Sequence, residues 1–258
     1  MLKHTLRSNW QIWVVLGLML IGAVIRFWNF VPGVMFQGDQ ARDALIVSDI
    51  FQKKDIVLIG PVMSVGNIYL GPLYYYFMLP WLWLSSPSPL GPVVAVAILN
   101  ILGIGLMYLV GKEIVGKKAA LISAVFFTFS SILIEYSRFS WNPNPVPIVM
   151  IAIVWALHRA LTHHPRYWLI VALGFSILIQ LHYVTLLTLG GLGLTWLYHI
   201  WKLHVSIQTS VLWRQLIPIT LGCVVIVILS LTPLFVFDLR HEGLNRKAFL
   251  SIFTQSQL

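Results

Sequence analysis

Two long stretches without a charged side chain constrain what this chain can fold into. Residues 56–111 and 167–201 contain no Asp, Glu, Lys or Arg. Charged residues make up 10% of the chain and hydrophobic residues 59%, whereas about one-quarter of a soluble domain is charged. These values exclude a soluble enzyme, a disordered chain and a disulfide-rich secreted domain. They predict a chain whose main solvent is lipid.

Continuous apolar runs predict an all-α polytopic membrane protein with about seven transmembrane helices. An outer-membrane barrel is excluded, because its strands alternate in polarity over about 10 residues. As one helix, residues 167–201 would be about 52 Å long, against a hydrocarbon core of about 30 Å. This stretch is therefore predicted to be a hairpin that breaks near residues 180–183. The other predicted spans are 8–25, 90–110, 119–134, 148–158 and 215–237.

The charges predict an orientation for these spans. Segment 72–84 is apolar but too short to cross a membrane, so we expect it to lie at the interface or to re-enter the membrane partway. With seven spans and a cytoplasmic N-terminus, the loops between spans on the cytoplasmic side are short and basic, as the positive-inside rule requires. Only Glu113 of the eight acidic residues then falls inside. The cytoplasmic basic residues are Lys3, Arg7, Lys112, Lys117, Lys118, Arg159, Arg166, Lys202 and Arg214.

The same distribution bears on partners. A net charge of +9 would indicate nucleic acid in a soluble protein, but here it is explained by topology, so no nucleic-acid partner is predicted. Polar groups gather on the external side, which predicts a site there. A transporter would more often place ionisable groups near the midplane. Cys223 is the sole cysteine, which excludes an internal disulfide and a thiolate metal site.

The first external loop, roughly 28–89, contains a predicted amphipathic surface helix over 38–51. Ala44, Val47, Ile50 and Phe51 recur at helical spacing. Asp39 stands at the start of this helix and has two interpretations. It either caps the helix by accepting a backbone N–H, or it acts as a general base that takes a proton from a hydroxyl.

Several motifs then follow one another in a fixed order. After the anchor helix and the loop with its early Asp come Gly-Pro-Leu-Tyr-Tyr-Tyr at 71–76 and the basic loop at 110–121. Tyr-Ser-Arg-Phe-Ser-Trp-Asn-Pro-Asn-Pro at 136–145 and Gln-Leu-His-Tyr at 180–183 come next. In this order and spacing the chain resembles the GT-C membrane glycosyltransferases, specifically glycosyltransferase family 39 and the protein O-mannosyltransferase-like group.

The resemblance implies a multi-pass enzyme of the cell membrane. Its donor would be a polyprenyl-phosphate-linked sugar, and its acceptor a hydroxyl of a protein, lipid or glycan on the external face, with inversion at the anomeric carbon. Asp39 falls where the family keeps its catalytic acidic residue, and Gln40 stands where many members have a second acidic residue. Members are usually longer, so residues 1–258 are expected to be one transmembrane module, either the conserved N-terminal module or a fragment truncated at its C-terminus.

The remaining candidates for substrate binding each have a structural alternative. Tyr74 and Tyr75, with nearby aromatic residues, form either an interfacial aromatic belt or a platform on which a sugar stacks. Arg138 either pairs with Glu135 three positions before it or clamps the donor phosphate. Asp43 has three possible roles: it replaces Asp39 as the base, it orients Asp39, or it binds Arg42. Arg42 and Asp43 are both candidates for substrate binding.

Three polar candidates lie at later external turns. Asn142 and Asn144 alternate with prolines and are turn residues, ligands of a sugar hydroxyl, or ligands of a divalent metal ion, whose requirement the sequence leaves open. His182 beside Tyr183 is either a structural histidine or a phosphate contact. The chain has no Gly-rich nucleotide loop, HExxH or CxxC motif, so a nucleotide-sugar donor is not supported. Two rival functions stay open, a lipid-linked sugar flippase or transporter and a non-catalytic membrane assembly protein.

Overall fold

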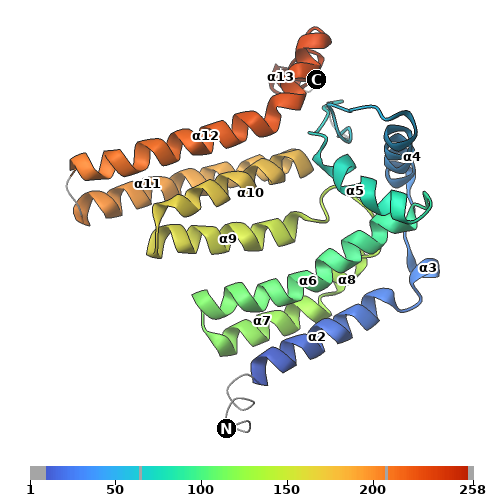
Figure 1. Cartoon of the computed structure of the whole chain (residues 1–258), viewed down its shortest axis with the longest axis horizontal. Helices are drawn as coiled ribbons and strands as arrows, with labels where there is room; N and C mark the ends of the chain where they lie inside the picture. The colour runs from blue at the N-terminus through green and yellow to red at the C-terminus, as the bar shows by residue number, and fades with distance from the viewer. Residues whose placement is uncertain (1–9, 64–65, 207–208, 255–258) are drawn as a thin grey trace. The chain divides into compact units, whose positions relative to one another are not determined.

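The computed structural model describes residues 10–63, 66–206 and 209–254. Within these residues the regular structure is helical apart from one isolated antiparallel bridge, Val62 to Tyr69, so the all-α prediction is confirmed. The chain divides into two compact units. Unit 1 comprises residues 1–54 and 77–155, and unit 2 comprises residues 55–76 and 156–258 (Figure 1).

Unit 1 is built around three helices that pack on one another, α2 (Trp10–Phe27), α6 (Leu90–Ile114) and α7 (Lys117–Phe129). Their shared core contains Leu18, Ile104, Ala124 and Phe127. Gly116, with φ of 87°, makes the turn between α6 and α7, a conformation that glycine adopts without the penalty of a side chain. The basic loop around Lys112 and Lys118 lies at this end of the unit.

The predicted span 119–134 is interrupted. Helix α7 ends at Phe129, Ser130 is extended, and α8 (Ser131–Tyr136) begins with the Ser130 hydroxyl accepting the N–H of Leu133. The fully buried Arg26 donates to the carbonyl oxygens of Thr128 and Phe127. A buried cation at a helix C-terminus satisfies carbonyls that have no helical partner. The break is therefore stabilised by a side chain about 100 positions away, which the local pattern did not predict.

The surface helix forms as α4 (Gly38–Lys53), but its buried face differs from the predicted one. The buried residues are Gln40, Asp43, Val47 and Ile50, whereas Phe51 is exposed. Asp43 can enter the buried face because Arg42 pairs with its carboxylate at 2.8 Å. Two short helices flank this region, α3 (Phe30–Gly33) and α5 (Leu73–Leu84).

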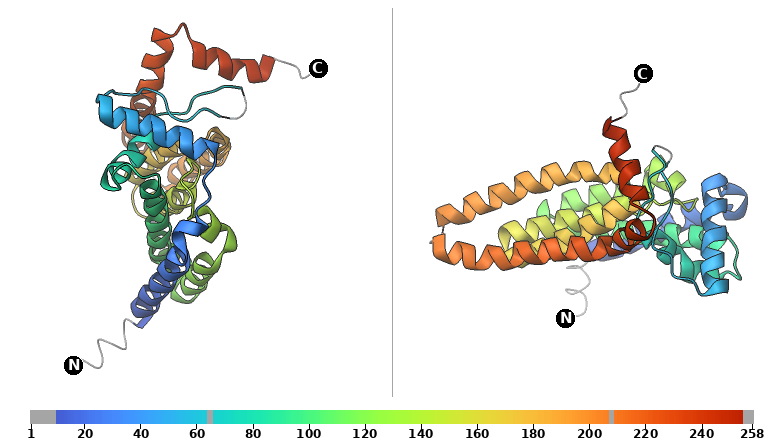
Figure 2. Two further views of the ribbon diagram at one scale, coloured as in Figure 1. Left: turned by 90° about the vertical axis from the view of Figure 1, so that its right-hand side faces the viewer. Right: turned by 90° about the horizontal axis from the view of Figure 1, so that it is seen from above.

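Unit 2 contains the predicted hairpin. Helix α10 (Trp168–Leu181) ends at the predicted position, and the 3₁₀ turn η2 (Tyr183–Leu187) leads into α11 (Thr188–Ser206). The long helix α12 (Thr209–Arg240) packs on α10, and α13 (Leu244–Thr254) follows it. Figure 2 shows α10, α11 and α12 running side by side. Helix α9 (Val146–Thr162) and the turn η1 (Pro165–Tyr167) precede them.

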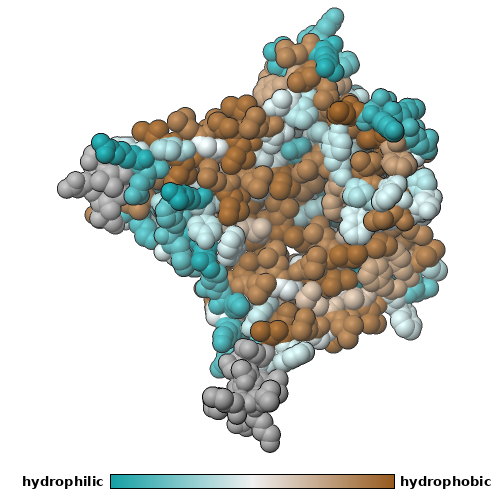
Figure 3. All heavy atoms as spheres, viewed as in Figure 1, coloured by the Kyte–Doolittle hydropathy of each residue, from teal (hydrophilic) through white to brown (hydrophobic). Residues whose placement is uncertain are grey.

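Within the described residues each predicted span overlaps a helix, although the span 119–134 is broken at Ser130. Four described segments are long and apolar enough to cross a membrane. These are Trp10–Phe27, Leu90–Ile114, Tyr183–Val205 and Trp213–Arg240. Helix α5, with 12 residues, is not among them. On the face drawn in Figure 3, apolar residues cover the helices of unit 2, and hydrophilic residues gather at the α9–α10 connection. The chain is thus a polytopic membrane protein, and the count of seven crossings stays a prediction; Lys3 and Arg7 lie outside the described residues.

Candidate functional site

The loop between α2 and α6 places an acidic cluster at the N-terminal end of α4. Arg42 lies between two carboxylates, with Nη1 3.0 Å from Oδ1 of Asp39 and Nη2 2.8 Å from Oδ1 of Asp43. The Asp39 side chain is 50% exposed and that of Asp43 is 2% exposed. The cluster thus combines one accessible carboxylate with one buried carboxylate, and a single guanidinium holds both.

Asp39 is not the N-cap of this helix. Gln37 is the cap residue, and its backbone N–H donates to Oε1 of Gln40 at 2.7 Å. Asp39 lies in the first turn, where its charge is favourable to the helix dipole. The capping interpretation of Asp39 is therefore wrong, and the general-base interpretation stays a prediction.

The 136–145 loop holds its own backbone through buried side chains. Nδ2 of Asn144 donates to the carbonyl oxygens of Tyr136 and Phe139, each at 2.7 Å, while its Oδ1 has no partner among the described residues. Asn142 is buried as well. Both asparagines are thus inside the loop, and Asn144 acts there as a turn residue.

Arg138 bridges two segments of unit 1. Its Nη2 donates to the carbonyl oxygens of Ile25 at 2.9 Å and Trp28 at 2.6 Å, where α2 ends. Its Nη1 lies against the α-carbon of Gly33, where a β-carbon would meet it. None of the ion pairs in the described part of the chain joins Arg138 to Glu135. The guanidinium keeps N–H groups for a phosphate, so the clamp stays a prediction.

The aromatic candidates Tyr74 and Tyr75 are buried, with exposed fractions of 0% and 3%. Tyr76 is more exposed, and its hydroxyl donates to the carbonyl oxygen of Val57 at 2.9 Å. In this conformation Tyr74 and Tyr75 offer no ring face to a sugar or to lipid headgroups. Trp83, at 58% exposure, is the member of this group best placed for an interfacial belt.

His182 caps the turn η2 in unit 2. Its Nδ1 accepts the backbone N–H of Val184 at 3.2 Å, so in the neutral ring the proton lies on Nε2. Burial lowers the pKa of His182, which favours this neutral form. The ring therefore has a structural role through Nδ1 and leaves Nε2–H available to an acceptor.

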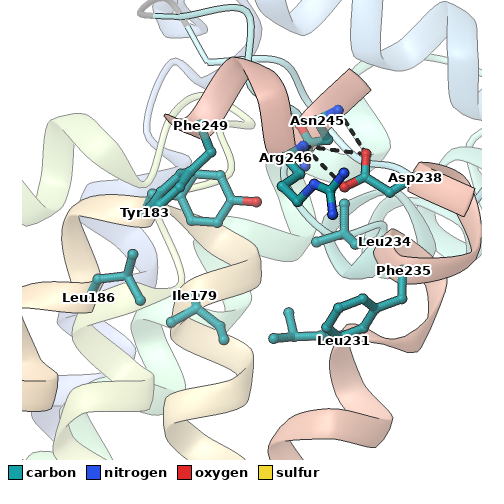
Figure 4. Close-up of a pocket in the computed structure, with 10 residues that line it drawn as sticks. All are labelled: Ile179, Tyr183, Leu186, Leu231, Leu234, Phe235, Asp238, Asn245, Arg246 and Phe249. Carbon is teal, nitrogen blue, oxygen red and sulfur yellow. Dashed lines mark hydrogen bonds between the residues drawn. The ribbon is translucent and has the colours of Figure 1, made fainter. Parts of the chain in front are cut away.

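Next to His182, the end of α12 and the start of α13 line an open cavity of about 370 Å³, here called the α12–α13 cavity (Figure 4). Its walls are mainly apolar, and its polar groups are few, as is typical of a ligand site. Residues lining it are Ile179, Tyr183, Leu186, Leu231, Leu234, Phe235, Asp238, Asn245, Arg246 and Phe249.

Most polar groups of this cavity are already engaged. The Asp238 carboxylate accepts the backbone N–H groups of Asn245 at 2.7 Å and Arg246 at 3.0 Å, which caps α13. The Asn245 side chain pairs with both backbone groups of Tyr69, and the Tyr183 hydroxyl donates to the same carbonyl. The Arg246 guanidinium has no hydrogen bond or ion pair to a described residue and is exposed.

Sequence reasoning missed Asn245 and Arg246 and assigned Asp238 only to the external acids. The available signal was Asp238 after the last apolar run, followed by Gly243, which adopts φ of 73°, and by the Leu-Asn-Arg start of a helix. Within residues 10–63, 66–206 and 209–254, no group of three or more His, Cys, Asp and Glu side chains is placed to hold a metal ion.

Residues 70–235 match the family model for dolichyl-phosphate-mannose-protein mannosyltransferases, more than half of the chain. The chain belongs to this family. The resemblance to GT-C glycosyltransferases is thereby confirmed, and membership indicates a mannosyltransferase-like membrane enzyme that uses a polyprenyl-phosphate-linked sugar. No curated protein and no solved structure matches the chain.

The matched residues of the mannosyltransferase family include only part of the candidate site. Arg138, Asn142, Asn144, His182 and Tyr183 fall inside them, as do Tyr74 and Tyr75. Asp39, Arg42 and Asp43 precede the match, and Arg246 follows it. The family match therefore does not support the roles of these four residues. The role of Asp39 and its neighbours rests on residue chemistry and on the family resemblance, and that of Arg246 rests on the structure.

Proposed function

We propose that the protein transfers mannose from a polyprenyl-phosphate donor to an acceptor hydroxyl at the external face of the cell membrane, with inversion. Its N-terminus would be cytoplasmic, and residues 1–258 would act as a single module. Family membership supports the donor and the sugar. The observation that carries the catalytic part is that Asp39 is half exposed, caps no helix and is held by Arg42.

The chemistry is a single displacement. The acceptor oxygen attacks the anomeric carbon, the bond from that carbon to the phosphate oxygen breaks, and the polyprenyl phosphate leaves with the bonding electrons. Asp39 takes the hydroxyl proton on Oδ2, because Oδ1 accepts from Arg42. A phosphate leaves without strong acid assistance, so one carboxylate is sufficient. One displacement inverts the configuration of the sugar.

Two groups of unit 2 are suited to the donor phosphate. His182 offers Nε2–H, and Arg246 offers a guanidinium whose planar N–H groups match phosphate oxygens. The α12–α13 cavity supplies apolar walls for the first part of the lipid. Arg138 of unit 1 remains a further candidate for the phosphate. The acceptor is a hydroxyl of a protein, lipid or glycan.

Comparison of cells with and without the gene tests this function. Mass spectrometry would measure lipid-linked mannose and the mannose content of envelope glycans and proteins. We expect deletion to remove mannose from an acceptor and to leave the donor unused, and Asp39→Asn to have the same effect. Unchanged acceptors in the deletion strain would contradict the proposal, whereas normal acceptors in Asp39→Asn cells would favour a non-catalytic assembly role.

A further inference from the structure

A second cavity, about 340 Å³ in volume, lies among α10, α11 and α12. Its walls include Ala172 and Phe175 of α10, Leu189 of α11, and Cys223 and Val227 of α12. We call it the deep cavity. The lining is apolar apart from the Cys223 thiol, whose Sγ lies 3.4 Å from the carbonyl oxygen of Trp168.

The deep cavity and the α12–α13 cavity share two helices, α10 and α12. On α12, Cys223 and Val227 line the first, and Leu231, Leu234 and Asp238 line the second. These residues are three or four positions apart, which places them on one helical face. Cys223 and Asp238 are fifteen positions apart, or about 22 Å along the helix. The two cavities therefore follow one another along α10 and α12, and we call the two together the groove.

This groove has one polar end and one apolar end. Arg246 stands at the polar end. At the other end Trp168 lines the deep cavity, and its Nε1 donates to Nδ1 of His199 at 2.7 Å. Trp196 packs edge-on against Trp168, with ring centroids 4.9 Å apart. Because Trp168 is held on two sides, its indole is a fixed part of the wall at this end, here called the Trp168 floor.

We infer that the groove holds the apolar chain of a polyprenyl phosphate from Arg246 to Cys223, and that the Trp168 floor makes the site selective for chain length. The inference rests on the proposed function, which supplies a lipid phosphate. Charge and polarity favour this occupant: a neutral lipid would form no ion pair with Arg246, and a compact anion would leave about 22 Å of apolar groove without a ligand contact. Chain length beyond the floor should add nothing to affinity.

Cys223 reports occupancy of the deep cavity directly, because it is the sole cysteine. Purified full-length protein would be labelled with an apolar maleimide in the presence of polyprenyl phosphates of graded length. At ten times its dissociation constant, a ligand leaves about one-tenth of the sites free. We therefore expect a long chain to slow labelling about tenfold and a phosphate with two isoprene units to leave it unchanged. Equal labelling with both would overturn the inference.

Two comparison ligands fix the chemistry of the occupant. Neutral polyprenol of the same length should protect Cys223 only at higher concentration, and Arg246→Gln should remove that difference between phosphate and alcohol. Phosphatidic acid should protect weakly. Protection by phosphatidic acid as strong as by the long polyprenyl phosphate would show a general phospholipid site and would overturn the inference.

A substitution that fills the deep cavity with a larger side chain provides the second test of chain-length selectivity. Ala172 lines the deep cavity and is 8% exposed, whereas its neighbour Leu173 is 52% exposed and lines neither cavity. Ala172→Phe should abolish the preference for long chains without changing affinity for the short one, and Leu173→Phe should preserve that preference. A stable Ala172→Phe protein that keeps the preference would contradict the inference. If Ala172→Phe does not fold, Cys223 protection in the unaltered groove still decides.

Failure of the groove can be separated from failure of the proposed function. If mannose is transferred equally well from short-chain and long-chain donors and Cys223 is never protected, the groove is wrong and the transferase stands. If no polyprenyl-phosphate mannose is turned over although Cys223 is protected, the proposed function is wrong and the lipid groove stands.

Discussion

At the scale of single residues, neighbouring side chains of α4 have separate roles. Gln40 is buried and accepts the N–H of Gln37, so it stabilises the start of the helix. The Asp39 carboxylate, in contrast, is half exposed and available to a substrate. In the N3 position of a capping box, Glu and Gln serve equally. The amide at position 40 therefore preserves the cap and removes the second negative charge that many family members have.

Restoring that charge tests whether Asp39 works alone. Gln40→Glu should keep the fold, because a carboxylate accepts the same backbone N–H. Because the transfer needs one base, we expect the rate of mannose transfer to stay within a few-fold, as measured with purified protein. Gln40→Ala is the comparison and should lower helix stability by about 1 kcal/mol. A rise of two orders of magnitude in Gln40→Glu would show that the reaction uses paired carboxylates.

His182→Asn separates the structural role of this histidine from donor binding. Asn can accept the N–H of Val184 and keep the cap, but it cannot reach the position of Nε2. One lost hydrogen bond to a charged phosphate is worth about 1.5–3 kcal/mol, so the donor KM should rise about tenfold or more with unchanged thermal stability. Steady-state kinetics at varied donor concentration measure this. Unchanged KM would leave His182 with its structural role alone.

The same variant has an expected pH signature. Burial lowers the pKa of His182 in the folded protein, so the folded state disfavours the protonated ring. Its contribution destabilises the protein as pH falls below the usual histidine value of about 6.5. His182→Asn should therefore lose less thermal stability than the unaltered protein between pH 7.5 and 5.5.

Among the site residues, the sequence predicts local relations better than distant ones. Arg42 pairs with Asp43, which was one of the predicted alternatives, and also with Asp39, because all three lie within one helical turn. The partners of Tyr183 and Arg138 could not be read from the pattern, because Tyr69 and Ile25 are more than 100 positions away. Arg246 was missed because its helix follows the last predicted span.

At the scale of elements, residues 60–63 pair with residues 68–71, and this pair of segments contacts α10 and α13 within unit 2. The N–H of Gly60 donates to the carbonyl of Leu70 at 2.7 Å, and Asn245 binds Tyr69. A β-carbon on Gly60 would collide with the backbone carbonyl of Gly71, and one on Gly71 would collide with the Gln180 side chain. The Gln180 side chain could change rotamer to relieve its collision, but the Gly71 backbone could not, so a side chain at residue 60 is the more costly change.

Gly60→Ala should therefore destabilise the protein by roughly 1–3 kcal/mol, the usual cost of overpacking. Gly191→Ala is the matched control, because Gly191 lies inside α11 with open space around it, and alanine favours a helix. Thermal unfolding in detergent measures both. Equal stability of the two variants would contradict the close approach of residues 60 and 71.

The sequence predicted the helices and the hairpin break well, because hydrophobic runs and polar turns are local signals. It did not predict the break at Ser130 or the buried Asp43 face of α4. Each depends on an arginine side chain. Arg26 binds the backbone carbonyls at the end of α7, and Arg42 binds the Asp43 carboxylate, which hydropathy alone would place on the exposed face.

At the scale of the whole molecule, the proposed function depends on which ends of the helices face outward. Within unit 2, His182 and Asp238 lie at one end of the helices, and Arg159, Arg166 and Lys202 lie at the other, where Lys202 donates to the carbonyl of Leu161. The positive-inside rule assigns the second end to the cytoplasm. The predicted orientation thus places the α12–α13 cavity outside.

Cysteine labelling tests that orientation in a Cys223→Ala background. Ser86→Cys should react with a membrane-impermeant maleimide on intact cells, and Val115→Cys, beside the basic loop and 60% exposed, should react only after the cells are opened. Val115 is preferable to Gly116, whose φ of 87° a cysteine would strain. Labelling of residue 115 but not 86 would contradict the seven-span arrangement.

Release of mannose from its lipid carrier is the most direct test of the central claim. Proteoliposomes containing the purified protein would be supplied with polyprenyl-phosphate mannose and an acceptor extract. We expect free polyprenyl phosphate and an inverted mannosyl product, and because a general base contributes about 10²–10⁴-fold, Asp39→Asn should lose that factor. Asp49→Asn, which alters an exposed ion pair with Lys53 on the same helix, should remain active. Intact donor that only changes leaflet, or equal release by Asp39→Asn, would contradict the account.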